Sequence, residues 1–204
     1  TLAGFLPSLV DLTSVHRRPI AGTSHGIRTL YISPLKALAV DIERNLAKPV
    51  SEMGLKISIE TRTGDTPVHK RQRQKLAPPD ILLTTPEQLA LLLASRDAAR
   101  FFSDLKYVIF DELHSLVTSK RGHLLSLGLA RLANLRPDLQ TIGLSATVSD
   151  PDDLCRWLLP SHERDKKAHL VLVSEGAAPD IGILRTEERI PWAGHSARHA
   201  MGEI

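Results

Sequence analysis

The chain has 204 residues, of which 42% are apolar and 24% are charged, and its formal net charge is +3. This composition is typical of a soluble globular protein and excludes collagen-like, fibrous and disordered chains. The longest purely apolar run spans six residues, 89–94, whereas a membrane-spanning helix needs roughly 18. The single cysteine, Cys155, cannot close an intrachain disulfide, so we expect a reducing, cytoplasmic location.

The positive charge is concentrated in one stretch. Between residues 61 and 75, Asp65 is the one acid among five basic residues, Arg62, Lys70, Arg71, Arg73 and Lys75. Such a cluster suits a polyanionic partner, and a solvated helix face accounts for it equally well. Aromatic residues make up only 4% of the chain, which argues against a platform on which bases stack.

Short apolar runs rich in β-branched residues alternate with segments of helical periodicity. In chain order we expect a helix from residue 2, a strand at 29–32, a helix over 35–46, strands at 57–60 and 81–83, a helix around 89–93, a strand at 107–110, a helix around 124–132, a strand at 141–144, a helix over 152–159 capped by Asp150, and a strand at 170–173. Most of the strands are continuously apolar, as in a parallel sheet that is buried on both faces. The alternation predicts an α/β fold.

Polar residues follow five of the predicted strands in succession. They are Ser33-Pro34, Gly64-Asp65, Thr85-Pro86, Asp111-Glu112 and Ser145-Ala146-Thr147. In open α/β sheets, ligands bind at the carboxyl ends of the strands. The pattern therefore predicts a ligand site built at one edge of the sheet.

We expect the chain to be a segment of a longer protein. Its first helical stripe begins at the first residues with no strand before it, whereas a crossover helix normally joins two strands. A linker-like stretch at 175–179 follows the last predicted strand, and only short apolar runs come after it. We therefore expect a domain over 1–174, and over 175–204 a linker and the start of a second domain.

The sharpest chemical signal is Asp111-Glu112-Leu113-His114, directly after a continuously apolar strand. A carboxylate at a strand end can hold Mg²⁺, and a second one can orient and deprotonate an attacking water. Adjacent residues at a strand-to-loop turn point in different directions, so the two carboxylates can take two roles. Asp-Glu also occurs in ordinary loops, but the hydroxyl residues Ser145 and Thr147 at the next strand end favour a catalytic site.

These residues resemble the motifs of superfamily 2 helicases. Asp111–His114 resembles the DExH box and Ser145–Thr147 the SAT motif. Three further stretches resemble motif Ia, motif Ib and the TPE motif, in the order that the family has them: 33–38, 63–66 and 85–89. The sequences of residues 31–41 and 118–122 are similar to those of the large helicase-related (Lhr) group. Within that group they are most similar to the bacterial ligase-associated DExH helicases, which are linked to DNA repair.

The resemblance implies a RecA-like, P-loop NTPase fold, an α/β architecture with a parallel sheet flanked by helices. In the family a strand and a Gly-rich phosphate loop ending in Gly-Lys-Thr come first, so this chain would lack both. Thr1 would then align with the hydroxyl residue that coordinates Mg²⁺ in that loop. Residues 181–204 resemble the entry into a second RecA-like domain, which would supply arginine fingers.

The resemblance also implies ATP and Mg²⁺ as cofactors. Thr1 and Asp111 would bind Mg²⁺, Glu112 would position the hydrolytic water, and His114 would link the nucleotide to Ser145 and Thr147. A second set would lie along the phosphate backbone of a nucleic-acid strand: Ser33, Pro34, Lys36, Gly64, Asp65, Thr66, Thr85 and Pro86. Backbone contacts suit translocation, because a motor must not stop at particular bases.

The implied activity of the parent protein is ATP-dependent 3′→5′ translocation on DNA or its unwinding, with a repair ligase among its partners. Two alternatives stay open. One is a non-catalytic nucleic-acid-binding fragment, because the phosphate-loop lysine is absent from this chain. The other is an RNA substrate, because backbone contacts discriminate weakly between the two sugars. Three motifs also have simpler explanations. Ser145 and Thr147 could cap a helix, and Ser33-Pro34 could form a turn. His195 and His199 could form half of a metal site, but no further ligand is in register with them.

Overall fold

The computed structural model describes residues 2–14, 25–146, 148, 150–159 and 168–172. Its centre is a five-stranded parallel sheet with the spatial order β2-β3-β1-β4-β5. The strands are β1 (Thr29–Ile32), β2 (Ile59–Arg62), β3 (Ile81–Thr84), β4 (Tyr107–Phe110) and β5 (Gln140–Gly143). The predicted α/β class with a parallel sheet is confirmed.

Helices precede the first strand, connect the strands and follow the last one. They are α1 (Leu2–Ser14), α2 (Lys36–Glu52), α3 (Val68–Leu76), α4 (Pro86–Leu93), α5 (Ala98–Phe101), α6 (Leu113–Val117), α7 (Lys120–Leu135) and α8 (Pro151–Leu158). As predicted, Asp150 caps α8, where its carboxylate accepts the backbone N–H of Asp153 at 3.1 Å. Among the described residues, no helix is long and apolar enough to cross a membrane.

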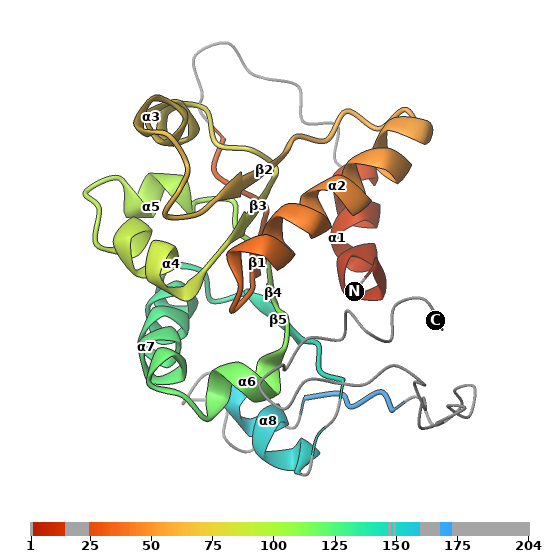
Figure 1. The fold of residues 1–204 in the computed structure, drawn as a ribbon, viewed down its shortest axis with the longest axis vertical. Coiled ribbons are helices and arrows are strands. Elements are labelled where there is room, and N and C mark those ends of the chain that lie inside the picture. The colour runs from red at the N-terminus through yellow and green to blue at the C-terminus, as the bar shows by residue number, and fades with distance from the viewer. Residues whose placement is uncertain (1, 15–24, 147, 149, 160–167, 173–204) are drawn as a thin grey trace, which may run out of the picture. The chain divides into compact units, whose positions relative to one another are not determined.

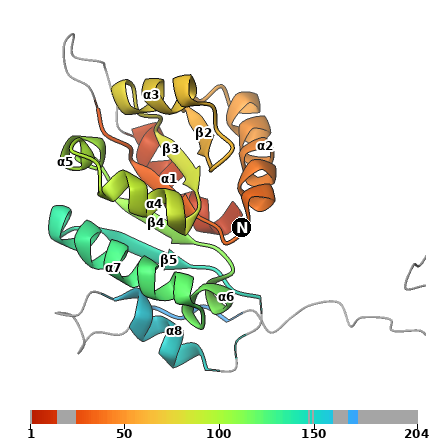
Figure 2. The same ribbon diagram turned by 60° about the vertical axis from the view of Figure 1, so that its left-hand side comes forward.

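The helices form layers on both faces of the sheet (Figures 1 and 2). On one face, α1 and α2 pack their apolar stripes against the strands, and Phe5 stacks on Tyr31 with ring centroids 5.3 Å apart. On the other face, side chains from α4 to α8 cover Leu30, Leu82 and Val108. The three central strands, β3, β1 and β4, are buried along their whole length, which explains why their sequences are continuously apolar.

Three strand predictions need correction at their ends, and the one at 81–83 is short by one residue, since β3 is Ile81–Thr84. The strand predicted at 57–60 is β2, Ile59–Arg62. The backbone oxygen of Ser58 accepts the N–H of Ile81 at 3.0 Å, but its N–H and hydroxyl donate to the Asp80 carboxylate, and the strand begins at the next residue. The strand predicted at 141–144 is β5, Gln140–Gly143. In both places the apolar run includes a residue that packs against the core but does not belong to the paired strand. These residues are Ile57 and Leu144.

A fourth strand prediction is wrong over the residues that the structure describes. Of the strand expected at 170–173, residues 170–172 have no strand geometry, and their side chains are 44–73% exposed. Apolar side chains that gain no burial have no reason to pair in a sheet. Residues 1–170 form one compact unit. Residue 173, the predicted linker at 175–179 and the predicted entry into a second domain at 181–204, with His195 and His199, lie outside the described residues. The domain boundary at 174 stays a prediction.

Two glycines of α7 provide a matched test of the packing at its beginning. A Cβ on Gly122 would lie 2.3 Å from the backbone oxygen of Leu116, whereas a Cβ on Gly128 would make ordinary contacts of 3.4 Å with Leu89 and Leu93. We expect Gly122→Ala to lower the free energy of unfolding by about 1–3 kcal/mol, because a backbone neighbour cannot move aside. Gly128→Ala should be neutral or stabilising, since alanine favours a helix. Denaturant unfolding of both variants checks this, and equal stabilities would contradict it.

Candidate functional site

The register of the sheet brings the carboxyl ends of its five strands to one level. Ile32 pairs with Thr84 on one side and Phe110 on the other, Thr84 pairs with Arg62, and Phe110 pairs with Gly143. The polar residues predicted from the sequence follow within two residues of these positions, so they lie along one edge of the sheet. The predicted gathering of polar strand ends is present in the fold, and the binding of a ligand there stays a prediction.

The spatial order of the strands divides this edge into two halves. The loops after β2, β3 and β1 lie side by side and carry Gly64-Asp65, Thr85-Pro86 and Ser33-Pro34. The ends of β4 and β5 are adjacent and carry Asp111-Glu112 and Ser145. The residues predicted for the nucleic acid therefore lie in one half, those predicted for the nucleotide lie in the other, and β1 stands at the border.

Both carboxylate oxygens of Asp111 are held by hydrogen bonds. The hydroxyl of Tyr31 donates to Oδ2, and the backbone N–H of Glu112 donates to Oδ1 at 3.0 Å. Tyr31 is fully buried and Asp111 is 7% exposed. Burial raises the pKa of Tyr31 well above its usual range, and the hydrogen bond to Asp111 raises it further. Tyr31 therefore stays a donor and holds the carboxylate in one orientation.

Glu112 is the one non-glycine residue with a positive φ among the described residues, with φ 50° and ψ 43°. A left-handed backbone costs a side-chain-bearing residue on the order of 1–3 kcal/mol and tends to persist at functional sites. This conformation turns the chain sharply between β4 and α6. The side chain of Glu112 is 41% exposed, while that of its neighbour Asp111 is buried, so the two adjacent carboxylates have different surroundings.

His114 lies between the ends of β4 and β5. Its Nδ1 is 2.7 Å from the hydroxyl oxygen of Ser145, and its Nε2 is 3.4 Å from Oε2 of Glu112. His114 and Ser145 thus share a hydrogen bond, and the role of His114 as a link from the nucleotide to Ser145 and Thr147 stays a prediction. A movement of the Glu112 carboxylate would therefore shift the imidazole ring of His114, and with it the hydrogen bond to Ser145. Thr1 and Thr147, predicted in the same half, lie outside the described residues.

Asp111 has the donor type that a magnesium ion requires. Mg²⁺ is commonly held by one or two carboxylates together with substrate phosphates and water, and it prefers oxygen ligands. Among the described residues there is no group of three or more His, Cys, Asp or Glu side chains placed to hold a metal. An ion at Asp111 would thus take most of its ligands from the bound nucleotide and from water, and the oriented carboxylate fits that arrangement.

Three of the residues predicted to face a nucleic acid meet at the surface. The ammonium of Lys36 lies 2.9 and 3.0 Å from the two carboxylate oxygens of Asp65, and both side chains are more than half exposed. The same ammonium would be 3.6 Å from a Cβ placed on Gly64. Lys36 is the first residue of α2, which follows β1, and Asp65 lies in the loop after β2, so the ion pair spans the intervening end of β3.

The other residues of that set support the loops from inside. Ser33 is fully buried, and its hydroxyl hydrogen-bonds with the backbone of Leu35. The hydroxyl of Thr66, 8% exposed, accepts the backbone N–H of Thr63 at 2.9 Å. Thr85 and Pro86 are also buried, whereas Pro34 is partly exposed. Lys36, Gly64 and Asp65 present their side chains or backbone outward, and the roles of the whole set stay predictions.

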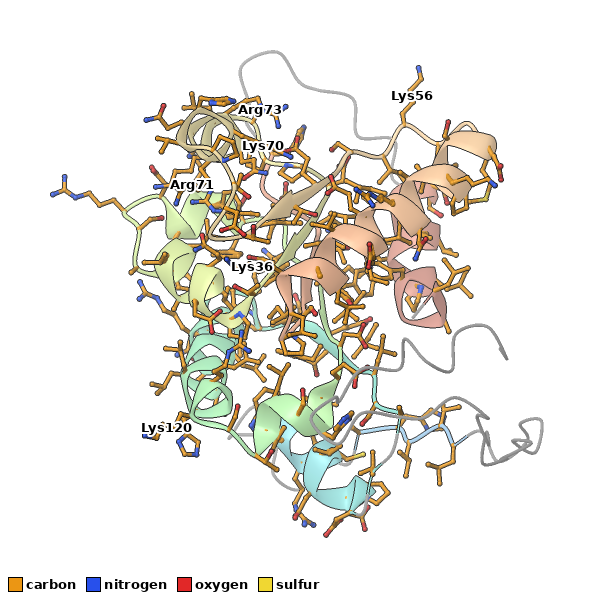
Figure 3. The ribbon with its side chains drawn as sticks, viewed as in Figure 1. Lys36, Lys56, Lys70, Arg71, Arg73 and Lys120 are labelled. Atoms are coloured by element: carbon orange, nitrogen blue, oxygen red, sulfur yellow. The ribbon has the colours of Figure 1, made fainter. Side chains whose placement is uncertain are left out.

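The basic side chains at 61–75 form one cluster in the sequence but differ in their burial and ion pairing. Arg62 is 6% exposed at the end of β2, where burial and the neighbouring Arg71 lower its pKa. Arg73 pairs with Glu60 at 2.6 Å. Figure 3 shows Lys70, Arg71 and Arg73 on α3 and Lys36 at the beginning of α2. Part of the cluster is therefore neutralised or buried, and both interpretations of it, a polyanion contact and a solvated face, stay open.

Two residues that the sequence analysis missed contact this edge. Tyr31 is one, and its signal was an aromatic hydroxyl between two apolar residues of a strand, Leu30 and Ile32. The other is Arg121 in the first turn of α7, which hydrogen-bonds to Glu87 and to the backbone oxygen of Pro34. Its partners lie 34 and 87 residues away in the sequence, so only the fold brings them together.

Comparison with known proteins agrees with this geometry. The family model described as DEAD/DEAH box helicase matches residues 1–154. The Lhr helicase/probable uracil glycosylase of Mycolicibacterium smegmatis is 43% identical over 169 residues, 78% of this chain and 11% of that protein. The ATP-dependent helicase Lhr-Core of Methanothermobacter thermautotrophicus is 40% identical over 194 residues, 90% of this chain and 22% of that protein.

A solved structure shares the fold. Mycobacterium smegmatis helicase Lhr bound to single-stranded DNA and AMP-PNP superposes with a TM-score of 0.66 and 42% identity, over 77% of this chain and 20% of that one. The chain thus spans only about a tenth to a fifth of the curated relatives described above. Its parallel sheet is the RecA-like fold of these helicases, as the motifs predicted. The family match over three quarters of its length, together with the relatives named Lhr, places this chain in the DEAD/DEAH box helicase family.

Proposed function

We propose that this chain is most of the first motor domain of an ATP-dependent helicase or translocase that moves 3′→5′ along a DNA strand. The observation that carries the proposal is the divided sheet edge. The carboxylates of Asp111 and Glu112, linked through His114 to Ser145, lie in one half, and the loops with Lys36, Gly64 and Asp65 lie in the other. A motor needs both kinds of site on one rigid body.

The residues of the chain divide the work as follows. Asp111, oriented by Tyr31, would hold Mg²⁺, and the bound ion would neutralise charge on the phosphates of ATP. Glu112, partly exposed, would orient the attacking water and accept its proton. His114 would pass the position of Glu112 to Ser145 and so to the end of β5. The solved Lhr structure named above contains AMP-PNP and single-stranded DNA, which supports ATP and DNA as the ligands.

ATP turnover by the full-length polypeptide that carries this segment tests the proposal. We expect turnover that rises when single-stranded DNA is added, and directional displacement of a strand annealed to a 3′ tail. No nucleic-acid stimulation would overturn the motor assignment. Stimulation by RNA with no response to DNA would favour an RNA helicase. Turnover by the 204-residue chain itself tests the alternative of a non-catalytic nucleic-acid-binding fragment, for which no hydrolysis is expected.

The cellular setting is part of the same proposal. We place the parent protein in the bacterial cytoplasm, associated with the nucleoid, and in DNA repair, with a second RecA-like domain in the same polypeptide and a DNA ligase as a partner. The resemblance of residues 31–41 and 118–122 to ligase-associated helicases supports this. Co-purification of a ligase with the full-length protein, and sensitivity of a deletion strain to DNA damage, are the tests. A strain with normal repair would contradict it.

Lys36 gives a direct test of the nucleic-acid half. We expect Lys36→Ala to weaken binding of single-stranded DNA about 3–10-fold and to reduce the slope of log K against log salt by about 0.7–1, the value for one lost phosphate contact. The matched control is Lys48→Ala, an exposed lysine on the same helix that lies 4.0 Å from Glu52. Fluorescence anisotropy at several salt concentrations measures both variants. Equal slopes for Lys36→Ala and the unsubstituted protein would exclude this contact.

A further inference from the structure

Arg121 joins three segments that are far apart in the sequence. Its Nε donates to Oε1 of Glu87 at 2.6 Å, its Nη2 to Oε2 of Glu87 at 3.1 Å, and its Nη1 to the backbone oxygen of Pro34 at 2.9 Å. Pro34 lies in the loop after β1, and Glu87 lies in the first turn of α4, directly after Thr85 and Pro86. The guanidinium of Arg121 therefore connects the loop after β1 with the first turn of α4, and both belong to the proposed nucleic-acid half.

The geometry of this contact is that of a specific clamp. A guanidinium that holds both oxygens of a carboxylate is oriented as well as attracted, and the third hydrogen bond goes to a backbone atom that side-chain rotation cannot displace. Burial works to raise the pKa of Glu87, but the hydrogen bonds it accepts, chiefly from Arg121, outweigh burial and lower that pKa. Glu87 is thus held as a carboxylate opposite Arg121.

The other end of the clamp is attached to the nucleotide half. Arg121 is the second residue of α7, which follows α6, and α6 carries His114. The corner between the two helices is tightly built. The hydroxyl of Ser119 accepts the N–H of Gly122 at 3.3 Å, and a Cβ on Gly122 would meet the backbone of Leu116 at 2.3 Å. A shift at the end of β4 that moves α6 would therefore carry the backbone of Arg121 with it.

We propose that Arg121 is a positioning residue that couples the α6–α7 corner to the loops at Pro34 and Thr85, and so transmits the state of the nucleotide half to the nucleic-acid half. This rests on the proposed function, because it assumes that those loops face a nucleic acid. The Arg121 and Glu87 side chains are 38% and 50% exposed, and ion pairs that exposed contribute little to folding. The role assigned to the clamp is therefore the relative placement of the loops.

The test uses Arg121→Ala and Arg121→Lys in the full-length polypeptide, with single-stranded DNA as the probe. Lysine keeps the charge, but its single nitrogen lacks the planar fork that holds both oxygens of Glu87 and the oxygen of Pro34 at once. For both variants we expect the DNA concentration that half-maximally stimulates ATP turnover to rise on the order of tenfold, as for the loss of one or two charge-assisted hydrogen bonds. Arg131→Ala, which removes an exposed arginine from the same helix, should leave that concentration unchanged.

Glu87→Gln probes the same contact from its other side and keeps the proposal testable if Arg121→Ala does not fold. We expect a smaller rise, and the double variant Arg121→Ala/Glu87→Gln should be no worse than Arg121→Ala alone, because the two substitutions remove one contact. A purely structural role would lower the thermal midpoint and the maximal turnover at an unchanged half-saturating DNA concentration. That result, or variants indistinguishable from the unsubstituted protein, would overturn the inference. An unsubstituted protein that DNA does not stimulate would overturn the proposed function instead.

Discussion

Glu112→Gln in the full-length polypeptide is expected to keep ATP binding and to lose DNA-stimulated hydrolysis by about 10²–10⁴-fold. Glutamine has nearly the same shape, so the left-handed turn between β4 and α6 and the hydrogen bond from its backbone N–H to Asp111 should persist. The amide cannot accept the proton of the attacking water, and a positioned general base contributes a factor of that size. Turnover with saturating DNA, together with binding of a fluorescent ATP analogue, measures the two properties separately.

The control for this substitution is Glu52→Gln, at the exposed end of α2. It removes the same charge from the surface far along the chain from the site and should leave both turnover and nucleotide binding unchanged. If Glu112→Gln retains most of its turnover, Glu112 is not the base and the catalytic assignment of the DExH stretch fails. A parallel loss of nucleotide binding would also count against it, because it would give Glu112 a binding role.

Most of the fold follows from the sequence because the strongest signals come from burial. The strand at 107–110 was predicted with its observed bounds, and all four of its residues are buried. The edge strand β5 is only partly buried, so its apolar pattern is weaker and its predicted bounds are shifted by one residue. Residues 170–172 have an equally apolar sequence but are exposed. An apolar run predicts that a segment can be buried, and only the tertiary structure decides whether it is.

The sequence was enough to predict the polar residues at the strand ends, whose roles stay predictions, but not their layout or the contacts of Tyr31 and Arg121. The sequence lists the polar strand ends in the order β1 to β5, and the sheet rearranges them so that the loops after β2 and β3 lie on one side of β1 and Asp111 on the other. The clamp of Arg121 joins residues that follow β1 and β3, which are neighbours only in this spatial order, and the ion pair of Lys36 with Asp65 spans the end of β3 that lies between β1 and β2. Contacts of this kind carry no local pattern.

Asp111→Asn is expected to lower Mg²⁺-dependent ATP turnover at least about 100-fold. The substitution removes the negative charge that would hold the ion, and a bound metal contributes several kcal/mol of charge stabilisation. It also disturbs the site locally, because the carboxylate accepts hydrogen bonds on both oxygens, from Tyr31 and from the backbone of Glu112. An amide offers one acceptor, so one of the two donors must lose its partner. Titration of turnover with Mg²⁺ at saturating ATP and DNA measures the effect.

Tyr31→Phe separates the charge of Asp111 from its orientation. Phenylalanine keeps the buried ring and its stacking on Phe5, and it removes only the hydroxyl that donates to Oδ2. We expect a loss of a few-fold in turnover with a higher Mg²⁺ requirement, far less than for Asp111→Asn, since the substitution removes one hydrogen bond to the carboxylate and leaves its charge in place. Asp41→Asn, an exposed acid on α2, is the control for lost charge. If Asp111→Asn were no more harmful than Tyr31→Phe, the charge of Asp111 would have no part in holding the metal, and the magnesium assignment would fall.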